Sequence, residues 1–408
     1  MYDLVVLGAW LEFAVRWLHV ITGIAWIGSS FYFIALDLGL RRDPPPASGA
    51  DGEEWQVHGG GFYHVQKYLV APAAMPDHLT WFKWESYATW LSGFAMLALV
   101  YYLGAEFYLV DPNVADIPAW QAIGISLGSL GFGWLAYDLI CKSRFGHDNT
   151  RLMIGLYIIL VAMAWGYTQV FTGRAALLHL GAFTATIMSA NVFFIIIPNQ
   201  KIVVADLKAG RVPDAKYGKI AKQRSTHNNY LTLPVLFLML SNHYPMAFAS
   251  QWNWAIASLV FLMGVTIRHW FNSVHARKGN PHWTWLVTVL LFLLIAWLST
   301  LKGPEAVGEA RLTPAQERFA QAEGFDQVTD IVMGRCSMCH AAEPNWEGLM
   351  WAPRDVRLDT PEGIARHARD IYLQAGVSHA MPPANLSYME EGERAAIVTW
   401  FRGARAGG

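Results

Sequence analysis

The stretch LHVITGIAWIGSSFYFIALD, residues 18–37, consists almost entirely of apolar and small side chains. A helix of about 20 such residues is long enough to cross the hydrocarbon core of a bilayer. The apolar run around this stretch covers residues 9–38, and comparable runs follow at 82–104, 117–141, 152–171, 175–198, 229–248, 253–273 and 282–301. The pattern therefore predicts an all-α fold, built as a polytopic membrane bundle of eight transmembrane helices.

The amino-acid composition fits a protein of the lipid bilayer and excludes several other classes. Only 15% of the 408 residues are charged, whereas a soluble domain carries about 25%. A net charge of −1 leaves no excess of basic residues for phosphates, so no nucleic-acid partner is expected. With three cysteines, the chain lacks the thiolates of an ordinary structural zinc site.

Lys and Arg residues are distributed unequally between the two ends of the predicted bundle. They are concentrated in the connections 41–81, 142–151 and 199–228, and they also flank the turn after 253–273. The connections at the other end carry a single one, Arg174. Because basic loops stay in the cytoplasm, the N-terminus and the end of the eighth helix are predicted to face the periplasm of a bacterial inner membrane.

The first and fifth apolar runs resemble each other. LHVITGIAWIGSSFYFIALD aligns with LHLGAFTATIMSANVFFIII (178–197), which places His19 over His179. An even number of helices per copy would give two parallel four-helix repeats, related by an axis along the membrane normal. The long aromatic connection 41–81 is predicted to lie on the cytoplasmic leaflet, with His64 and Lys67 spaced to share a helical face.

Near the end of the chain, GRCSMCH places Cys336 and Cys339 two residues apart and His340 directly after them. C-x-x-C-H is the attachment motif of a c-type haem, with the histidine as an iron ligand. Met381 in SHAMPPAN (378–385) is the expected second ligand, and His379 competes with it. A thioether opposite a histidine raises the reduction potential, which suits an electron acceptor.

Residues 302–312 are small and polar and contain Pro and Gly, as expected of a linker. The sequence therefore divides into a membrane domain (1–301), this linker and a soluble domain (313–408). The soluble part resembles small class I cytochrome c domains in its C-x-x-C-H motif, its M-P-P segment and its final amphipathic stretch. It is predicted to lie in the periplasm, where haem is attached to such motifs.

Polar residues inside the predicted helices form two groups, and such residues are functional candidates because they are costly in lipid. The outward group contains Glu12, Arg16, His19, His179, Asn242, His243 and Tyr244. The cytoplasmic group contains His227, Asn228, Asn229, Arg268, His269, Asn272 and His275. Planar donors and acceptors beside an arginine suit an anionic heterocyclic ligand.

Three stretches carry a family resemblance that covers nearly the whole chain. WLHVITGIAWIGSSFYF (17–33), HNNYLTLPVLFLMLSNHYP (227–245) and RHWFNSVHARKGN (268–280), followed by the cytochrome c-like end, resemble the bacterial membrane-bound urate oxidases, also called cytochrome c-linked urate hydroxylases. The resemblance implies oxidation of urate to 5-hydroxyisourate. It also implies that electrons pass to the haem and on to a respiratory-chain acceptor, such as a soluble cytochrome c or a terminal oxidase, without oxygen as the direct acceptor.

The chemistry of urate selects candidates among the polar residues. Urate is a monoanion at neutral pH, so its site needs a cationic contact, and its oxidation needs a base and an oriented water. The outward group is favoured because it lies on the side of the predicted haem. We expect Arg16 to bind the anion and His19 and His243 to act as base or to position water, with His179 as the next candidate.

Two alternatives stay open at the level of sequence. LH…AWIG in the first helix also resembles the haem-binding helix of a four-helix protoporphyrinogen oxidase family, so His19 and His179 are alternative ligands of a b-type haem or copper ion. Such a centre would carry electrons to the outer haem from a cytoplasmic urate site. That site would consist of His227, Asn228, Asn229, Arg268 and His269. The second alternative is an electron-transfer subunit for another dehydrogenase or a quinol partner.

Overall fold

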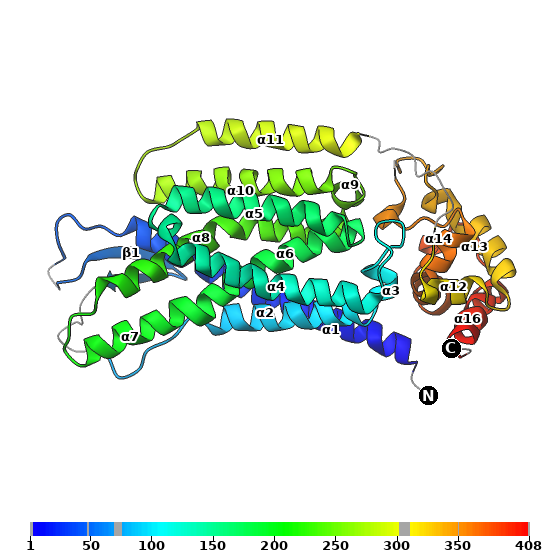
Figure 1. The fold of residues 1–408 in the computed structure, drawn as a ribbon, viewed down its shortest axis with the longest axis horizontal. Coiled ribbons are helices and arrows are strands. Elements are labelled where there is room, and N and C mark those ends of the chain that lie inside the picture. The colour runs from blue at the N-terminus through cyan, green and yellow to red at the C-terminus, as the bar shows by residue number, and fades with distance from the viewer. Residues whose placement is uncertain (1–2, 47–48, 69–75, 302–310, 350, 407–408) are drawn as a thin grey trace.

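The computed structural model describes residues 3–46, 49–68, 76–301, 311–349 and 351–406. Long helices run side by side through most of its length (Figure 1). This helical bundle consists of α1 (Leu4–Gly39), α2 (Trp84–Leu97), α4 (Ala119–Lys142), α5 (Asn149–Thr168), α6 (Gly173–Ala190), α8 (Ala215–Leu240), α10 (Asn253–His275) and α11 (Trp283–Thr300). Each predicted apolar run coincides with one of these helices.

Among the described residues, six helices are long and apolar enough to cross a membrane. They are α1, α4, α5, the continuous helix from α6 through η3 (Asn191–Ile196) to α7 (Ile197–Lys208), α10 and α11. The prediction of several apolar membrane helices is confirmed, whereas the count of eight stays a prediction. Two bundle helices, α2 and α8, are not among these six. Helix α2 has 14 residues before the π-helix η1 (Ala98–Tyr102), and α8 carries many polar side chains.

The connection after α1 contains a two-stranded hairpin that the all-α prediction missed. Strand β1 (Gly52–His58) pairs antiparallel with β2 (Gly61–Lys67), and Gly59 and Gly60 form the turn with φ of 58° and 79°. Positive φ at both central residues suits a two-residue hairpin turn. His64 and Lys67 therefore lie on a strand, and the prediction that they share a helical face is wrong.

Local sequence explains where the bundle helices begin and how closely they pack. Asp3, Asp148 and Thr172 each accept hydrogen bonds from backbone N–H groups in the first turns of α1, α5 and α6, which satisfies donors that the helix leaves free. Gly264 of α10 faces Pro234 of α8, and a Cβ atom there would lie 2.5 Å from the proline ring. Glycine thus permits the close approach of the two helices.

The C-terminal segment, residues 311–406, is helical and has a hydrophobic core of its own. Its helices are α12 (Pro314–Ala320), α13 (Phe325–His340), α14 (Pro361–Arg366), α15 (Ala368–Ile371) and α16 (Glu391–Ala406). Val332, Ile397 and Trp400 are fully buried there, and the indole of Trp400 donates to the carbonyl of Phe319 at 3.0 Å. Most of the predicted linker, residues 302–310, lies outside the described residues.

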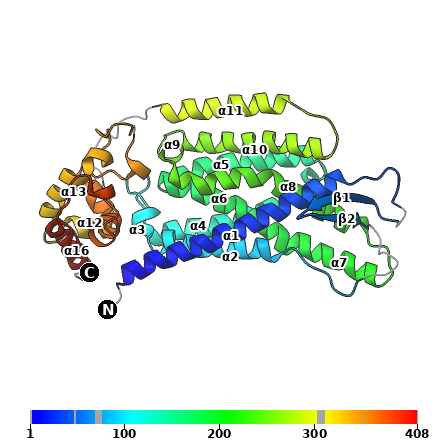
Figure 2. The ribbon, with the colours of Figure 1, turned by 180° about the vertical axis from the view of Figure 1, so that it is seen from behind.

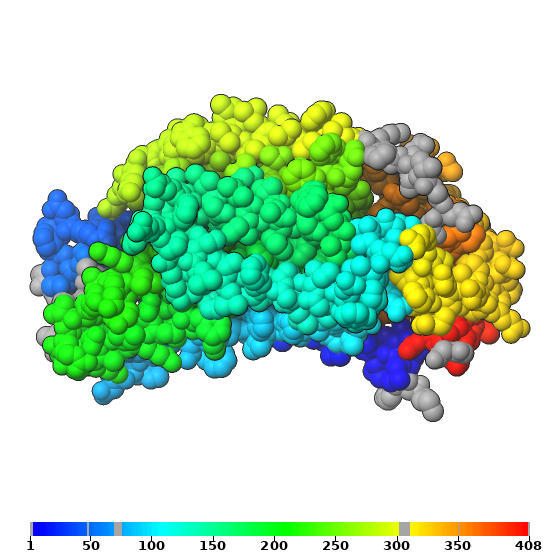
Figure 3. Space-filling model, in the orientation of Figure 1, coloured from blue at the N-terminus to red at the C-terminus, as the bar shows by residue number. Residues whose placement is uncertain are grey.

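The C-terminal segment packs against the end of the bundle where the chain begins (Figures 2 and 3). Asp3 accepts hydrogen bonds from Tyr372 and, at 3.1 Å, from Arg402. Glu106 of α3 (Ala105–Tyr108) accepts from the backbone N–H of Ala315 at 2.8 Å. The hairpin lies at the opposite end of the bundle (Figure 2). The N-terminus and the C-terminal segment therefore share one end, and its periplasmic placement stays a prediction.

Candidate functional site

Positively charged side chains from three parts of the chain meet where the bundle touches the C-terminal segment. Arg16 comes from α1, Arg174 from the first turn of α6, and Arg354 from the 3-10 helix η5 (Pro353–Asp355) of the C-terminal segment. All three lie close enough to His243, in η4 (Ser241–His243), for their charges to act on its ring. We call these four residues the arginine cluster.

The arginine cluster has no counter-ion at ion-pair distance within the described residues. The Nε atoms of Arg16 and Arg174 are buried and have no hydrogen-bond partner in the part of the chain that the structure describes. Burial and the charge of Arg174 lower the pKa of Arg354, with Asp370 opposing and Arg16 adding to the shift. Unpaired charges out of water are costly. A bound anion would offset that cost.

Two further side chains extend the arginine cluster into the bundle. Tyr101 is buried beside Arg174 and Arg16. Its ring lies 5.6 Å from the ring of His179, which is 0% exposed and donates from Nδ1 to the carbonyl of Ala175 at 2.8 Å. The Nε2 atom of His179 has no partner. His179 therefore lies behind Tyr101, on the bundle side of the arginine cluster, and its ring is buried.

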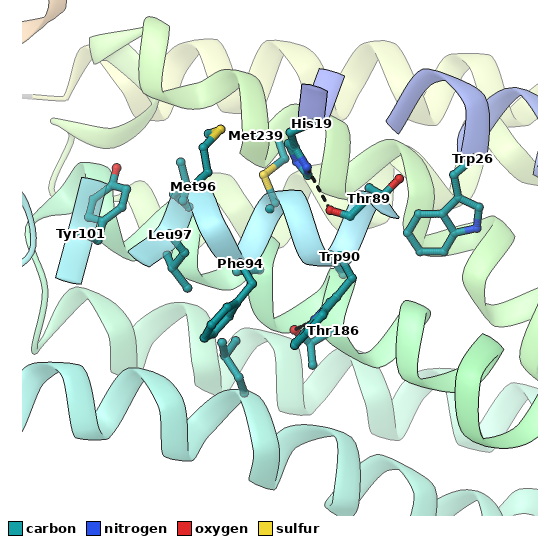
Figure 4. Close-up of a pocket in the computed structure, with 15 residues that line it drawn as sticks. His19, Trp26, Thr89, Trp90, Phe94, Met96, Leu97, Tyr101, Thr186 and Met239 are labelled. Carbon is teal, nitrogen blue, oxygen red and sulfur yellow. Dashed lines mark hydrogen bonds between the residues drawn. The ribbon is translucent and has the colours of Figure 1, made fainter. Parts of the chain in front are cut away.

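His19 lies apart from the arginine cluster. Its Nδ1 is 3.0 Å from the carbonyl of Thr89 and 3.1 Å from the hydroxyl of Ser92, and Figure 4 shows the ring reaching from α1 toward Thr89. A Cβ atom at Gly93 would lie 2.8 Å from the ring. The expected grouping of His19 with Arg16 and His243 is therefore not what the structure shows.

The ring of His19 lines a cavity of about 60 Å³ that is almost wholly apolar. Tyr101, at its other end, is the link between this cavity and the arginine cluster. The volume holds a few water molecules, and the surrounding side chains leave no room for a porphyrin. His179 does not line this cavity. This cavity therefore does not bring His19 and His179 together, and the alternative b-type haem or copper ion stays a prediction.

Glu12, a member of the predicted outward group, lies in the interface between the bundle and the C-terminal segment. Its carboxylate accepts from Arg369 at 2.6 Å. The neighbouring Asp370 accepts from the hydroxyl of Tyr108 at 3.3 Å and lies 3.5 Å from Nδ1 of His367. These contacts join α1, α3 and α15. Glu12 is therefore a docking residue.

A second polar cluster lies deeper in the bundle, toward the hairpin end. Arg224 is 2% exposed and pairs with Asp138 at 2.7 Å, and it donates to Asn191 at 3.2 Å. Asn191 in turn donates to Asn228 at 3.1 Å, and His227 lies 2.7 Å from the hydroxyl of Tyr137. We call this set the Asp138–Arg224 cluster. Its arginine has its own counter-ion.

The five residues of the alternative cytoplasmic site do not converge. His227 and Asn228 belong to the Asp138–Arg224 cluster, whereas Arg268 donates to Asn229 and Asn272 at 3.3 and 3.1 Å and lies over the ring of Phe31. His269 is placed separately, 3.5 Å from the hydroxyl of Tyr230. Sequence grouped these residues because they are adjacent along α8 and α10, but adjacent residues on a helix point in different directions.

The C-x-x-C-H motif forms the last turn of α13. Nδ1 of His340 lies 2.8 Å from the carbonyl of Val356, which leaves Nε2 as the nitrogen for a metal. Burial lowers the pKa of His340 and so favours the neutral ring that a ligand needs. Cys336 and Cys339 are free and half-buried. These residues fit the attachment of a c-type haem.

The loop that carries Met381 is held by a buried arginine. Arg394 of α16 donates to the carbonyls of Ala375 and Met381 at 2.6 and 2.9 Å. The competing ligand His379 is exposed and lies 3.8 Å from Glu391. No group of three His, Cys, Asp or Glu side chains in the described residues is arranged to hold a metal by itself.

Comparison with known proteins covers the bundle. The family model described as urate oxidase N-terminal matches residues 5–299, which include all the bundle helices apart from the first residue of α1 and the last residue of α11. No curated protein and no solved structure matches the chain. The match implies an oxidoreductase with a urate-related function. Since it spans more than half of the residues, the chain belongs to the urate oxidase N-terminal family.

Proposed function

We propose that this protein oxidises urate to 5-hydroxyisourate in the bacterial inner membrane and passes the electrons to a haem c of its C-terminal segment. The urate monoanion and one water give 5-hydroxyisourate, one proton and two electrons. The final acceptor is a component of the respiratory chain, such as a soluble cytochrome c or a terminal oxidase. Oxygen takes no direct part.

The observation that carries this proposal is the arginine cluster. Three guanidinium groups without a counter-ion, two of them from helices of the urate oxidase N-terminal family, suit a planar anion with several carbonyl oxygens. The cluster adjoins the segment that contains the C-x-x-C-H motif, so a substrate bound there would be near the electron acceptor. The Asp138–Arg224 cluster offers neither the spare charge nor this position.

Within the cluster, Arg16 and Arg174 would hold the anion. His243 is exposed and faces all three arginines, so it is the best placed base for the proton that leaves with the electrons. His179, buried behind Tyr101, would position rather than touch the substrate. His19 is fixed by Thr89 one helix turn deeper than Arg16, and its proposed catalytic role would be indirect.

The residues of the C-terminal segment would hold the cofactor. Cys336 and Cys339 would form the two thioether bonds, and His340 and Met381 would ligate the iron. When bound, a c-type haem supplies one-electron redox chemistry. Arg394 holds the Met381 loop and thereby keeps the thioether in place.

Anaerobic mixing of urate with the purified protein tests the proposal. We expect the reduced haem c absorption spectrum to appear without oxygen. Dithionite serves as the control that the haem is reducible. If dithionite reduces the haem and urate does not, the proposal is wrong, and an electron-transfer subunit that serves another dehydrogenase becomes the better interpretation.

A further inference from the structure

Arg354 differs from the other cationic residues at this end of the molecule because the C-terminal segment supplies it. It lies in η5, two residues before Val356, whose carbonyl is 2.8 Å from the ring of His340. This 3-10 helix packs against α9 (Pro245–Phe248), directly after His243. Arg354 thus stands between the C-x-x-C-H motif and the bundle.

The backbone at Arg354 is held in an uncommon conformation. Arg354 and Asp355 have φ of 58° and 56°, in the left-handed region that side chains other than glycine avoid. Such strain persists where the surroundings impose it and is concentrated at functional sites. In this conformation the Arg354 side chain keeps contact with solvent at the junction but loses part of its hydration there, and its charge acts on His243.

The contacts between the domains fix the position of Arg354 relative to the bundle. Arg369 pairs with Glu12 at 2.6 Å, and Asp370 accepts from Tyr108 at 3.3 Å. Asp370 also acts electrostatically on Arg354, but not at ion-pair distance. Arg354 therefore lies within electrostatic range of Arg16 and Arg174 and has no ion-pair partner among the described residues.

We infer that the substrate site is shared between the two domains and that Arg354 supplies a contact to the bound oxopurine anion. The inference rests on the proposed function and adds a role for the C-terminal segment beyond accepting electrons. Arg16 and Arg174 hold the anion from the bundle, and Arg354 closes over it from the side of the haem. A carboxylate of the haem has the same chemistry as a ligand, and the test below separates the two occupants.

Urate binding to the full-length holoprotein, reduced beforehand with dithionite, tests the inference. Pre-reduction prevents turnover, so equilibrium dialysis with labelled urate measures affinity alone. Arg354→Gln removes the charge, Arg354→Lys retains it, and Arg357→Gln is the matched control, because Arg357 is a neighbouring arginine paired with Asp355 at 3.0 Å. The midpoint potential of the haem is measured for each variant.

We expect Arg354→Gln to weaken urate binding about ten- to a hundredfold, which is typical for the loss of a hydrogen bond to a charged group. Arg354→Lys should recover part of the affinity, and Arg357→Gln should bind within about twofold of the wild type. Unchanged binding by Arg354→Gln, with or without a shift of midpoint potential, overturns the shared site; a shift would assign Arg354 to the haem. Failure of the wild-type protein to bind urate would instead contradict the proposed function itself.

Discussion

Two clusters in this protein combine arginine with histidine, and they differ in whether the charge is neutralised. In the Asp138–Arg224 cluster, a buried carboxylate pairs with the arginine at 2.7 Å, and the amide oxygen of Asn191 accepts a further hydrogen bond from it at 3.2 Å. In the arginine cluster, three guanidinium groups face His243 without an ion-pair partner in the described part of the chain. Arg224 therefore has a carboxylate counter-ion within the protein, whereas we propose that the arginine cluster takes its counter-ion from a bound anion.

Whether the arginine charge is neutralised within the protein distinguishes a structural role from a binding role better than the residue types do. A buried ion pair that loses one partner leaves an uncompensated charge, so its residues are needed for the fold. The residues of the arginine cluster have no such partner to lose, so we expect them to matter for the binding of the proposed anion and not for the fold. The two clusters should therefore respond in opposite ways to substitution.

The largest effect is expected from Asp138→Ala. The substitution leaves Arg224 buried without its carboxylate, and breaking such a pair costs about 3–5 kcal/mol. We expect a marked fall in the melting temperature of the detergent-purified protein, followed by circular dichroism. Asp206→Ala is the control, because Asp206 pairs with the exposed Arg211 and should cost no more than about 1 kcal/mol. Equal melting temperatures for wild type and Asp138→Ala would show that the Asp138–Arg224 cluster is not structural.

The second prediction concerns Arg16→Gln. Loss of a charged contact to the substrate should lower kcat/KM for urate-dependent haem reduction by about ten- to a hundredfold. The melting temperature should not fall, because the change removes an unpaired charge. Arg151→Gln, at the exposed start of α5, should change neither quantity. A loss of stability with unchanged kcat/KM would reverse the roles assigned to the two clusters.

The bundle helices could be predicted from the sequence, whereas the hairpin and part of the candidate site could not. A helix lies at each predicted apolar run, because the length of an apolar run can be read directly from the local sequence. The hairpin was missed because Gly59 and Gly60 indicate only a bend, and the pairing of Trp55 with His64 is set by a turn that no helical period reports. For the candidate site, Arg16 and His243 meet in the arginine cluster as expected. The ring of His19 is held by Thr89 and Ser92 of α2, a contact that spacing along α1 could not predict.

The residues that sequence reasoning missed illustrate the limits of that reasoning. The sequence distinguishes Arg174, because it is the single basic residue in the outward connections. The count of basic residues predicts only the orientation of the chain in the membrane, and not a binding role for Arg174. Arg224 was counted among the loop charges, although the structure buries it in α8. No sequence pattern indicates Arg354 as a site residue, because its position depends on how the C-terminal segment docks on the bundle. The docking contacts join residues hundreds of positions apart.

The third prediction tests whether His19, whose ring is held by α2, acts indirectly on the arginine cluster. Gly93→Ala would bring a Cβ atom to 2.8 Å from the His19 ring, and such overpacking costs about 1–3 kcal/mol. We expect lower stability together with slower urate-dependent haem reduction, because the displaced ring shifts the helix that carries Arg16. Gly128→Ala in α4, where nothing lies within 4 Å of the added atom, is the control. Normal kinetics in Gly93→Ala would exclude His19 from the site.

The smallest effect is expected at the docking contact of Asp3. The hydrogen bond from Tyr372, together with Val5 N–H and Arg402, lowers the pKa of Asp3 from 3.8 to about 2. A carboxylate with a lowered pKa stabilises the docked state above its ordinary pKa and loses this contribution as the pH falls toward about 2. Hydrogen exchange at the start of α1, corrected for intrinsic rates, should rise between pH 4 and pH 2 in the wild type. Asp3→Asn should show the raised exchange at neutral pH, and an identical pH profile in both would contradict the assignment.

The most direct measurement is an electron cryomicroscopy structure of the dithionite-reduced holoprotein in the presence of urate. We predict density for a planar ligand in contact with Arg16, Arg174 and Arg354, beside His243, and no added density at Asp138 and Arg224. Ligand density at Arg268 and Asn229, or an arginine cluster occupied only by the carboxylates of the haem, would contradict the claim that the unneutralised arginines form the urate site.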